Sequence, residues 1–228
     1  METSGRISVA IDGPSGAGKS TLARAAAKEL GFVYVDTGAI YRTVACHTLR
    51  RGVDPQDGAA VEGLLPEISI AMSYDGSGLQ RMFLNGEDLT DLIRTQEVSM
   101  AASKVSAHPA VRAFLLEMQR KMAERYSVIM DGRDIGTVVL PRADVKIFLT
   151  ASSEARARRR WLELREKGVE KDFQQLLRET RERDENDTNR AAAPLRPAED
   201  AVELDTTELT FEESRQRILS IIRERTGL

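Results

Sequence analysis

A glycine-rich loop near the N-terminus constrains the fold of this chain more than any other feature. Glycines let backbone N–H groups approach anionic oxygens closely, because no Cβ stands in the way. A lysine at the end of such a loop can reach the β- and γ-phosphates of a nucleotide, and a following hydroxyl suits Mg²⁺. The pattern G-x-x-x-x-G-K-[ST] therefore predicts a phosphate-binding loop for a nucleoside triphosphate, with Ser20 on the metal. The loop consists of Gly13, Pro14, Ser15, Gly16, Ala17, Gly18, Lys19, Ser20 and Thr21.

The residues on either side of the loop strengthen this prediction. Residues 7–11 are almost all apolar, as in a strand that is buried on both faces of a parallel sheet. Residues 21–31 are rich in strong helix formers and end on Gly31, a residue type that commonly terminates helices. A strand, a glycine loop and a helix in this order place phosphates at a helix N-terminus.

The rest of the chain alternates between strand and helix patterns. Such alternation is typical of a doubly wound sheet, and we expect an α/β fold with a five-stranded parallel sheet flanked by helices. Four later strands are expected at 32–36, 128–131, 145–149 and 201–205, and helices at 39–51, 109–125, 153–167, 172–185 and 211–225.

One stretch, from about 62 to 93, departs from the alternation. Residues 68–74 and 79–84 flank the turn-forming sequence Asp75-Gly76-Ser77-Gly78, which predicts a β-hairpin. Asn85-Gly86 predicts a second tight turn into a short third strand. We therefore expect a small antiparallel β insert on the parallel core.

Composition bounds the partners and the compartment. No apolar stretch approaches the roughly 18 residues of a membrane span, and the N-terminus lacks a signal-peptide pattern. The single Cys46 cannot form an internal disulfide, so we expect a buried thiol and a cytoplasmic, membrane-free protein. A net charge of −3 does not indicate a nucleic-acid partner. No apolar heptad pattern stands out, and a monomer is expected.

Arginine accounts for 26 of the 33 basic residues. Arginine suits bidentate contact with phosphate oxygens, although a genome-wide preference for arginine codons would give the same ratio. Arginines at three places could converge on phosphate. For the arginine run at 156–160 taken alone, a solvated helix face balanced by Glu154 and Glu163 is the simpler interpretation. The three places are Arg133 just past a predicted strand, the run of Arg156, Arg158, Arg159 and Arg160, and the pair Arg183 and Arg190 on either side of Asp187.

These features favour phosphoryl transfer to a second substrate. In that reaction the protein mainly positions donor and acceptor and neutralises charge. The sequence has no N-K-x-D guanine motif and no L-S-G-G-Q transporter signature, and no Ser-His-Asp or metal-ligand pattern competes. Because an anionic acceptor needs its own set of cations, the arginines favour a kinase over a simple hydrolase.

Five motifs occur in one order along the chain, at residues 13–19, 36–42, 94–98, 131–137 and 183–190. Together they resemble the motifs of bacterial cytidylate kinases. The resemblance runs from about residue 6 to 225 and implies transfer of the ATP γ-phosphate to CMP or dCMP with Mg²⁺. It also implies one kinase chain with its core at about 1–61, 94–152 and 198–228, a nucleotide-binding insert at about 62–93 and a helical lid at about 153–197. In the last motif the matching residues are Arg183, Asp184, Asp187, Asn189 and Arg190.

The resemblance further implies roles for individual residues. The catalytic set is Lys19, Arg133, Arg156, Arg160, Arg183 and Arg190. Within it, Arg183 and the arginines of 156–160 close over the transferred phosphate, with spacing favouring Arg156 and Arg160. The acceptor α-phosphate is held by Arg42, Arg133 and Arg190. The remaining acceptor contacts are Asp187 to the ribose, Thr37 lining the pocket, and Ser103, Arg112 and Asp134 on the base.

Two other functions stay open at this point. A kinase for UMP or AMP would share the phosphate-handling residues, and the Arg112–Asp134 pair argues against it only by resemblance. A non-catalytic nucleotide sensor would bind ATP without transferring phosphate. Intact Lys19, Ser20 and lid arginines argue against a sensor. For Ser103, a plain surface position on a helix is the alternative.

Overall fold

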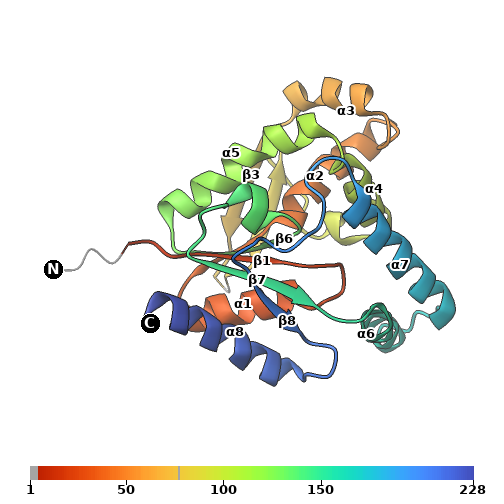
Figure 1. Ribbon diagram of the computed structural model, residues 1–228. Helices are drawn as coiled ribbons and strands as arrows, with labels where there is room; N and C mark the ends of the chain where they lie inside the picture. The colour runs from red at the N-terminus through yellow and green to blue at the C-terminus, as the bar shows by residue number, and fades with distance from the viewer. Residues whose placement is uncertain (1–4, 77) are drawn as a thin grey trace.

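A five-stranded parallel sheet forms the centre of the protein in the computed structural model, which describes residues 5–76 and 78–228 (Figure 1). The strand order is β2-β6-β1-β7-β8, and all neighbouring pairs are parallel. The predicted sheet is therefore confirmed, with strand bounds within one residue of those expected. The strands are β1 (Ser8–Asp12), β2 (Val33–Asp36), β6 (Val128–Gly132), β7 (Val145–Thr150) and β8 (Val202–Asp205).

Helices cover both faces of this sheet because strand side chains alternate between two apolar cores. Val9 and Ile11 of β1 belong to the core under α1 (Lys19–Leu30) and α8 (Phe211–Thr226). Ala10, between them, belongs to the opposite core. That second core lies under α2 (Thr37–Arg50), α4 (Gln96–Val105) and α5 (Pro109–Arg125). The doubly wound arrangement is thus built from strands that are apolar on both faces.

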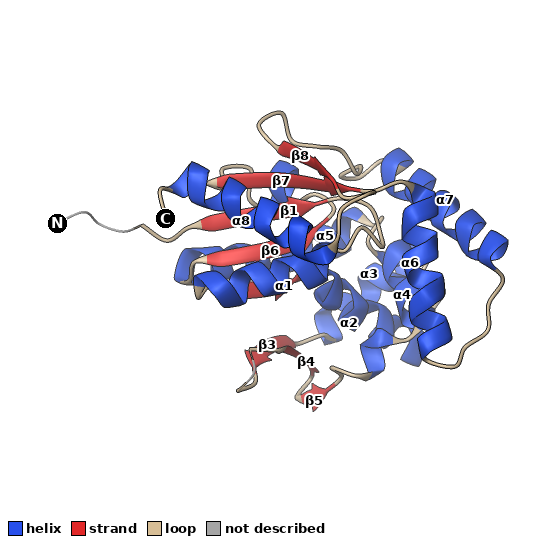
Figure 2. Cartoon of the chain, turned by 90° about the horizontal axis from the view of Figure 1, so that it is seen from below, coloured by secondary structure: helices blue, strands red, loops and turns tan. Residues whose placement is uncertain are grey.

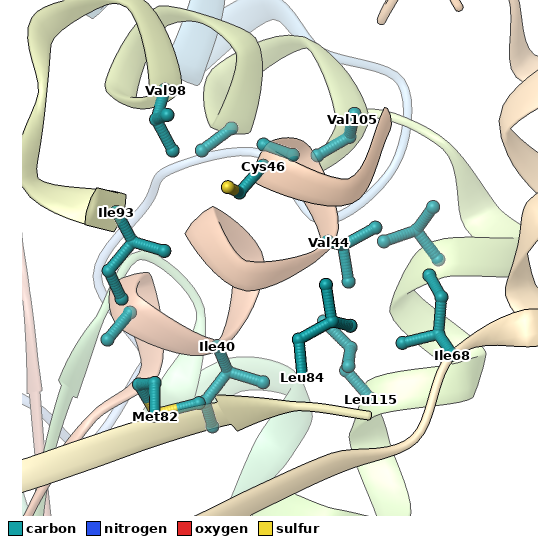
Figure 3. Packing of buried hydrophobic residues seen from close by; sticks show 14 of the residues in the cluster. Ile40, Val44, Cys46, Ile68, Met82, Leu84, Ile93, Val98, Val105 and Leu115 are labelled. Carbon is teal, nitrogen blue, oxygen red and sulfur yellow. The ribbon is translucent and has the colours of Figure 1, made fainter. Parts of the chain in front are cut away.

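The predicted antiparallel insert is also present. Strands β3 (Ile70–Tyr74), β4 (Gln80–Leu84) and β5 (Glu87–Asp88) form a separate three-stranded sheet on the α2 side of the molecule (Figure 2). Figure 3 shows Met82 and Leu84 of β4 among the side chains of α2, in the same apolar core. Asn85 and Gly86 both have positive φ, as the predicted tight turn requires. Ser77, in the predicted hairpin turn, lies outside the described residues.

Helical structure between residues 58 and 105 was not predicted. The seven-residue α3 (Gly58–Leu64) is too short for a clear periodicity, and two 3₁₀ turns, Leu65–Glu67 and Leu92–Arg94, accompany it. For α4 the signal existed, since Val98, Ala101, Ala102 and Val105 recur at helical spacing and are buried. A π-helical segment, Ile135–Val139, follows β6.

Two further helices, α6 (Ser153–Glu166) and α7 (Phe173–Asn189), pack against each other beyond the carboxyl ends of the strands (Figure 1). Helix α7 continues four residues past its predicted end, despite Asn186 and Asn189. The buried Asp187 in this last turn pairs with Arg133, so a tertiary contact outweighs weak helix propensity. No helix in the described parts of the chain is long and apolar enough to cross a membrane.

Gly13 joins β1 to the glycine loop at a point of close backbone contact. Its φ is 147°, and a Cβ at this position would lie 1.9 Å from the carbonyl oxygen of Leu149 in β7. Only glycine fits, because neither the backbone of a central strand nor the loop can move away cheaply.

We expect Gly13→Ala to lower the free energy of unfolding by about 2–4 kcal/mol, through backbone strain and overlap with Leu149. Urea unfolding measures this change. Gly63→Ala is the matched control, because Gly63 is in α3 and a Cβ there meets nothing within 4 Å. The control should raise stability by up to about 1 kcal/mol through helix propensity. Equal effects of the two substitutions would contradict the account.

Candidate active site

A cavity of about 720 Å³ opens at the carboxyl ends of the strands, where ligands bind in open α/β sheets. The glycine loop, the start of α2, the loop after β6, α4 and α7 all contribute to its wall. The predicted residues Lys19, Ser20, Thr37, Arg42 and Ser103 line this cavity. So do Arg112, Arg133, Asp134, Arg183, Asp187 and Arg190. The structure thus brings together residues spread over more than 170 positions of sequence.

The glycine loop has the backbone that the motif predicts. Gly16 and Gly18 have φ values of 76° and 89°, and α1 begins at Lys19. The loop amides and the N-terminus of α1 are therefore available to an anion. Lys19 is buried and its Nζ donates a hydrogen bond to the carbonyl oxygen of Pro14 at 2.7 Å. Burial, followed by the charge on Arg133, holds the pKa of Lys19 well below its usual value.

Oxygen atoms beside the loop fit a magnesium ion. Ser20 Oγ donates a hydrogen bond to Asp131 Oδ2 at 2.8 Å, and the Tyr34 hydroxyl donates to Asp131 Oδ1 at 2.8 Å. Burial, and then the charge on Asp36, raises the pKa of the Asp131 carboxyl. Mg²⁺ needs only one or two protein ligands beside substrate phosphates. A hydroxyl next to a buried carboxylate therefore suits it, and among the described residues no cluster of three or more His, Cys, Asp or Glu competes.

The three arginines that the resemblance assigns to the acceptor phosphate, Arg42, Arg133 and Arg190, each lie near a carboxylate. Arg42 Nη2 lies 2.9 Å from Asp36 Oδ2, and Arg133 Nε lies 2.8 Å from Asp187 Oδ2. Arg190 Nη2 is 3.7 Å from Asp134 Oδ1, which is beyond hydrogen-bond distance.

Several guanidinium N–H groups at this site are buried without a hydrogen-bond acceptor. They belong to Arg42 (Nε), Arg183 (Nε) and Arg190 (Nη2). A buried donor without a partner is costly, and such groups are rare in folded proteins. Burial and the charge on Arg133 lower the pKa of Arg183 to about 10, and burial followed by Arg112 lowers the pKa of Arg190. The cavity therefore concentrates positive charge and unmatched donors, as an anion site requires.

The residues that the resemblance assigns to the base also line the cavity. Arg112 donates to the carbonyl oxygen of Ser106 at 3.1 Å and pairs with Asp134, and its guanidinium stands 5.7 Å from the centre of the Tyr41 ring. Asp134 is buried. Thr37 is also buried, and its hydroxyl donates to the carbonyl oxygen of Asp131 at 2.7 Å. Thr37 thus lines the cavity while its proton is held by the backbone.

The two arginines predicted from the 156–160 run to act in transfer, Arg156 and Arg160, make different contacts. Arg156 is buried and donates to the carbonyl oxygens of Ala151 and Ser15 and to both carboxylate oxygens of Asp184. It therefore connects the glycine loop to α7. Arg160 is exposed and pairs with Glu163 on its own helix. The transfer role predicted for Arg156 and Arg160 requires both side chains to leave these contacts.

Sequence reasoning named the arginine run of α6, but it did not single out the apolar side chains of α6 or the segment after β8, which complete the cavity wall. Arg159 lies in this wall and donates to the carbonyl oxygen of Thr206 at 2.5 Å. Leu162, Leu209 and Phe211 line it as well. The available signal was weak, because exposed apolar residues occur singly on most surfaces.

Comparison with known proteins identifies the family. The family model for cytidylate kinase matches residues 9–224. The chain belongs to the cytidylate kinase family. A cytidylate kinase from Geobacillus thermodenitrificans is 51% identical over 222 residues, covering 97% of this chain and 99% of that protein. One from Caldicellulosiruptor bescii is 49% identical over 216 residues, covering 95% of each.

The family membership makes this chain a nucleoside monophosphate kinase. Among solved structures, a shikimate kinase from Bacteroides thetaiotaomicron has a TM-score of 0.49 and 16% identity, covering 95% of this chain and 98% of that one. That likeness is too distant to bear on the substrate.

Asp12 connects the two halves of this active site. It is buried at the end of β1, and its two oxygens accept the backbone N–H groups of Ile135 and Gly136, both at 2.7 Å. The strand that enters the glycine loop is thereby tied to the segment that carries Arg133 and Asp134. Burial raises the pKa of Asp12 from 3.8 to about 6, against the opposing effect of the two amides.

This pKa predicts a specific dependence of stability on pH. Because the folded-state pKa of Asp12 lies above the unfolded value, the folded protein binds the extra proton between pH 3.8 and about 6. The free energy of unfolding of wild type minus that of Asp12→Asn should therefore decrease by about 2–3 kcal/mol as pH rises from 4 to 7. Urea unfolding at several pH values measures it, and the other carboxylates cancel in the difference. A difference that grows with pH would contradict the raised pKa.

Proposed function

We propose that this enzyme transfers the γ-phosphate of ATP to CMP and dCMP, giving ADP and the corresponding cytidine diphosphate. The printed name of the relatives, cytidylate kinase, supports the substrate class. The observation that carries the proposal is the set of buried, unmatched guanidinium donors on Arg42, Arg183 and Arg190 around one cavity. Such donors favour an anionic acceptor placed opposite the glycine loop.

The phosphates are divided between two parts of the site. The loop amides and Lys19 hold the β- and γ-phosphates of the donor, while Arg42, Arg133 and Arg190 hold the α-phosphate of the acceptor. Arg183 contributes charge between them as the phosphoryl group passes in line from donor to acceptor. Ser20 and Asp131 would hold Mg²⁺, which would neutralise negative charge on the donor phosphates.

The carboxylate of Asp134 gives the site its preference among bases. Cytosine offers an amino group at N4, and a carboxylate accepts a hydrogen bond from it. Uracil places a carbonyl oxygen there, so that two acceptors would face each other in a buried place. Arg112 keeps Asp134 in position through their ion pair and can donate to the ring acceptors. Ser103 is half-buried and lines the same cavity.

The sugar of the acceptor is proposed to contact Asp187. Burial acts to raise the pKa of this carboxyl, but the charge of Arg133, its hydrogen bond and Arg183 together hold the pKa below its usual value. Asp187 is therefore a charged acceptor for sugar hydroxyls. The deoxyribose of dCMP lacks the 2′-hydroxyl but keeps the 3′-hydroxyl as a donor to Asp187. We therefore propose that dCMP is also an acceptor.

The nucleoside of ATP is proposed to lie between α6 and the segment after β8. Leu162 is 46% exposed and Phe211 is 51% exposed, although both line the cavity. Arg159 is held in place by Thr206 in the same wall. An aromatic ring, an apolar chain and a planar cation are a suitable surface for a purine.

The proposal is tested by an ADP-release assay with Mg-ATP and CMP, dCMP, UMP, AMP or GMP in turn. A strong preference for CMP and dCMP supports both the reaction and the base contacts. Turnover of UMP or AMP in preference to CMP overturns the base assignment and keeps the kinase. ADP release with none of the five would favour the nucleotide sensor.

Asp134→Asn should lower kcat/KM for CMP by about 10- to 100-fold and reduce the preference for CMP over UMP. The amide keeps an acceptor for N4 but loses the charge that binds Arg112, and its NH₂ can donate to the uracil carbonyl. Glu124→Ala on α5, an exposed carboxylate away from the cavity, serves as the control and should leave both values unchanged. Equal losses for CMP and UMP would make Asp134 a structural residue.

A further inference from the structure

Gln80 is a buried polar residue on an otherwise apolar strand face. It begins β4 of the antiparallel insert, and the other inward-facing residues of that strand are Met82 and Leu84. The Gln80 residue is only 3% exposed. A side-chain amide at such a place is costly unless its oxygen and nitrogen are both hydrogen-bonded.

Both ends of the Gln80 amide bind the backbone of a single residue in the main sheet. Oε1 accepts the N–H of Asp36 at 2.8 Å, and Nε2 donates to the carbonyl oxygen of Asp36 at 3.2 Å. Asp36 ends β2, which is the edge strand of the parallel sheet. The amide of Gln80 therefore acts as the missing neighbour at that edge, donating and accepting as a paired strand would.

Asp36 in turn holds a residue of the proposed phosphate site. Its Oδ1 accepts the N–H of Ala39 at 2.8 Å, which caps α2, and its Oδ2 pairs with Arg42 Nη2 at 2.9 Å. Arg42 lines the cavity and has a buried Nε without an acceptor. A continuous path of hydrogen bonds thus runs from the insert through Asp36 to Arg42.

We propose that Gln80 is a positioning residue for the acceptor nucleotide. It holds the backbone of Asp36 so that the Asp36 carboxylate presents Arg42 to the acceptor phosphate. The inference rests on the proposed role of Arg42 at that phosphate. Through Gln80, the insert would influence the phosphate site without itself contacting the acceptor phosphate.

The test compares Gln80→Met with Thr90→Val. Met has a length similar to that of Gln but leaves the N–H and carbonyl of Asp36 without partners. Thr90→Val removes a buried hydrogen bond, from Met82 N in β4 to Thr90 Oγ1 at 3.0 Å, that is separate from the hydrogen bonds between Gln80 and Asp36. Gln80→Met should lower kcat/KM for CMP about tenfold and leave the KM for ATP within about twofold of wild type. Thr90→Val should lower thermal stability and leave kcat/KM for CMP within about twofold.

A double-mutant cycle with Arg42→Ala separates positioning from general destabilisation. If Gln80 acts through Arg42, Gln80→Met causes no further loss of kcat/KM in the Arg42→Ala protein. If Gln80→Met fails to fold, Gln80→Asn takes its place: the neutral side chain is one methylene too short to bind both the N–H and the carbonyl oxygen of Asp36, and a loss of kcat/KM for CMP in the same direction is expected. Equal effects of Gln80→Met and Thr90→Val, or a full tenfold loss in the Arg42→Ala protein, would overturn the inference.

The outcome for Gln80 is separable from that of the proposed function. If wild type prefers another acceptor, the base assignment fails, and the same cycle is run with that nucleotide. If wild type turns over CMP but Gln80→Met does so normally, only the role of Gln80 is lost. If wild type transfers phosphate to none, the proposed function and the inference that rests on it fail together.

Discussion

Charge buried at the carboxyl edge of the sheet is the constraint on which the rest of this structure depends. Strands β1, β2 and β6 each deliver a buried aspartate there, Asp12, Asp36 and Asp131. Burial of unpaired charge is costly, so each carboxylate is matched by amides, hydroxyls or an arginine. The arginines at this edge are less fully satisfied, because buried N–H groups of Arg42, Arg183 and Arg190 have no hydrogen-bond acceptor. A phosphate group can supply that acceptor, and a site arranged in advance reorganises little when it does.

Three buried polar contacts connect separate parts of the chain to this edge. Asp12 binds the segment after β6, Arg156 links the glycine loop to α7, and Gln80 links the insert to Asp36. Each contact is inside the protein, where a hydrogen bond is strong and its loss leaves a costly unpaired group. The donor loop, the helical pair and the insert are therefore held in one arrangement around the cavity. A displacement of any of these parts would therefore move the residues proposed to bind phosphate.

The strands and the glycine loop were predictable because their signals are local. A buried parallel strand is an apolar run, and the loop needs glycines at given spacings, so neither depends on distant residues. Arg133, Arg183 and Arg190 were singled out from their positions in the sequence, and Arg42 and Asp134 were named from a family resemblance. The structure places all five in one cavity. Gln80 was missed because its partner, Asp36, is 44 positions away, and the sequence of β4 alone gives no sign of the contact. The arginine run at 156–160 is a second case in which sequence spacing was insufficient. Spacing favoured Arg156 and Arg160, whereas Arg159 is the arginine of this run that lines the cavity. Arg156 instead pairs with Asp184 of α7, and Arg160 pairs with Glu163 on its own helix.

The most direct test of the central claim is a crystal structure of the protein with Mg²⁺, CMP and a non-hydrolysable ATP analogue. The account predicts that Arg42, Arg133, Arg183 and Arg190 donate to phosphate oxygens, with the γ-phosphate mimic between the glycine loop and the CMP phosphate. It also predicts that the unmatched donors of Arg42, Arg183 and Arg190 acquire acceptors in the complex. Phosphates bound elsewhere, with these arginines still turned only to their carboxylates, would contradict it.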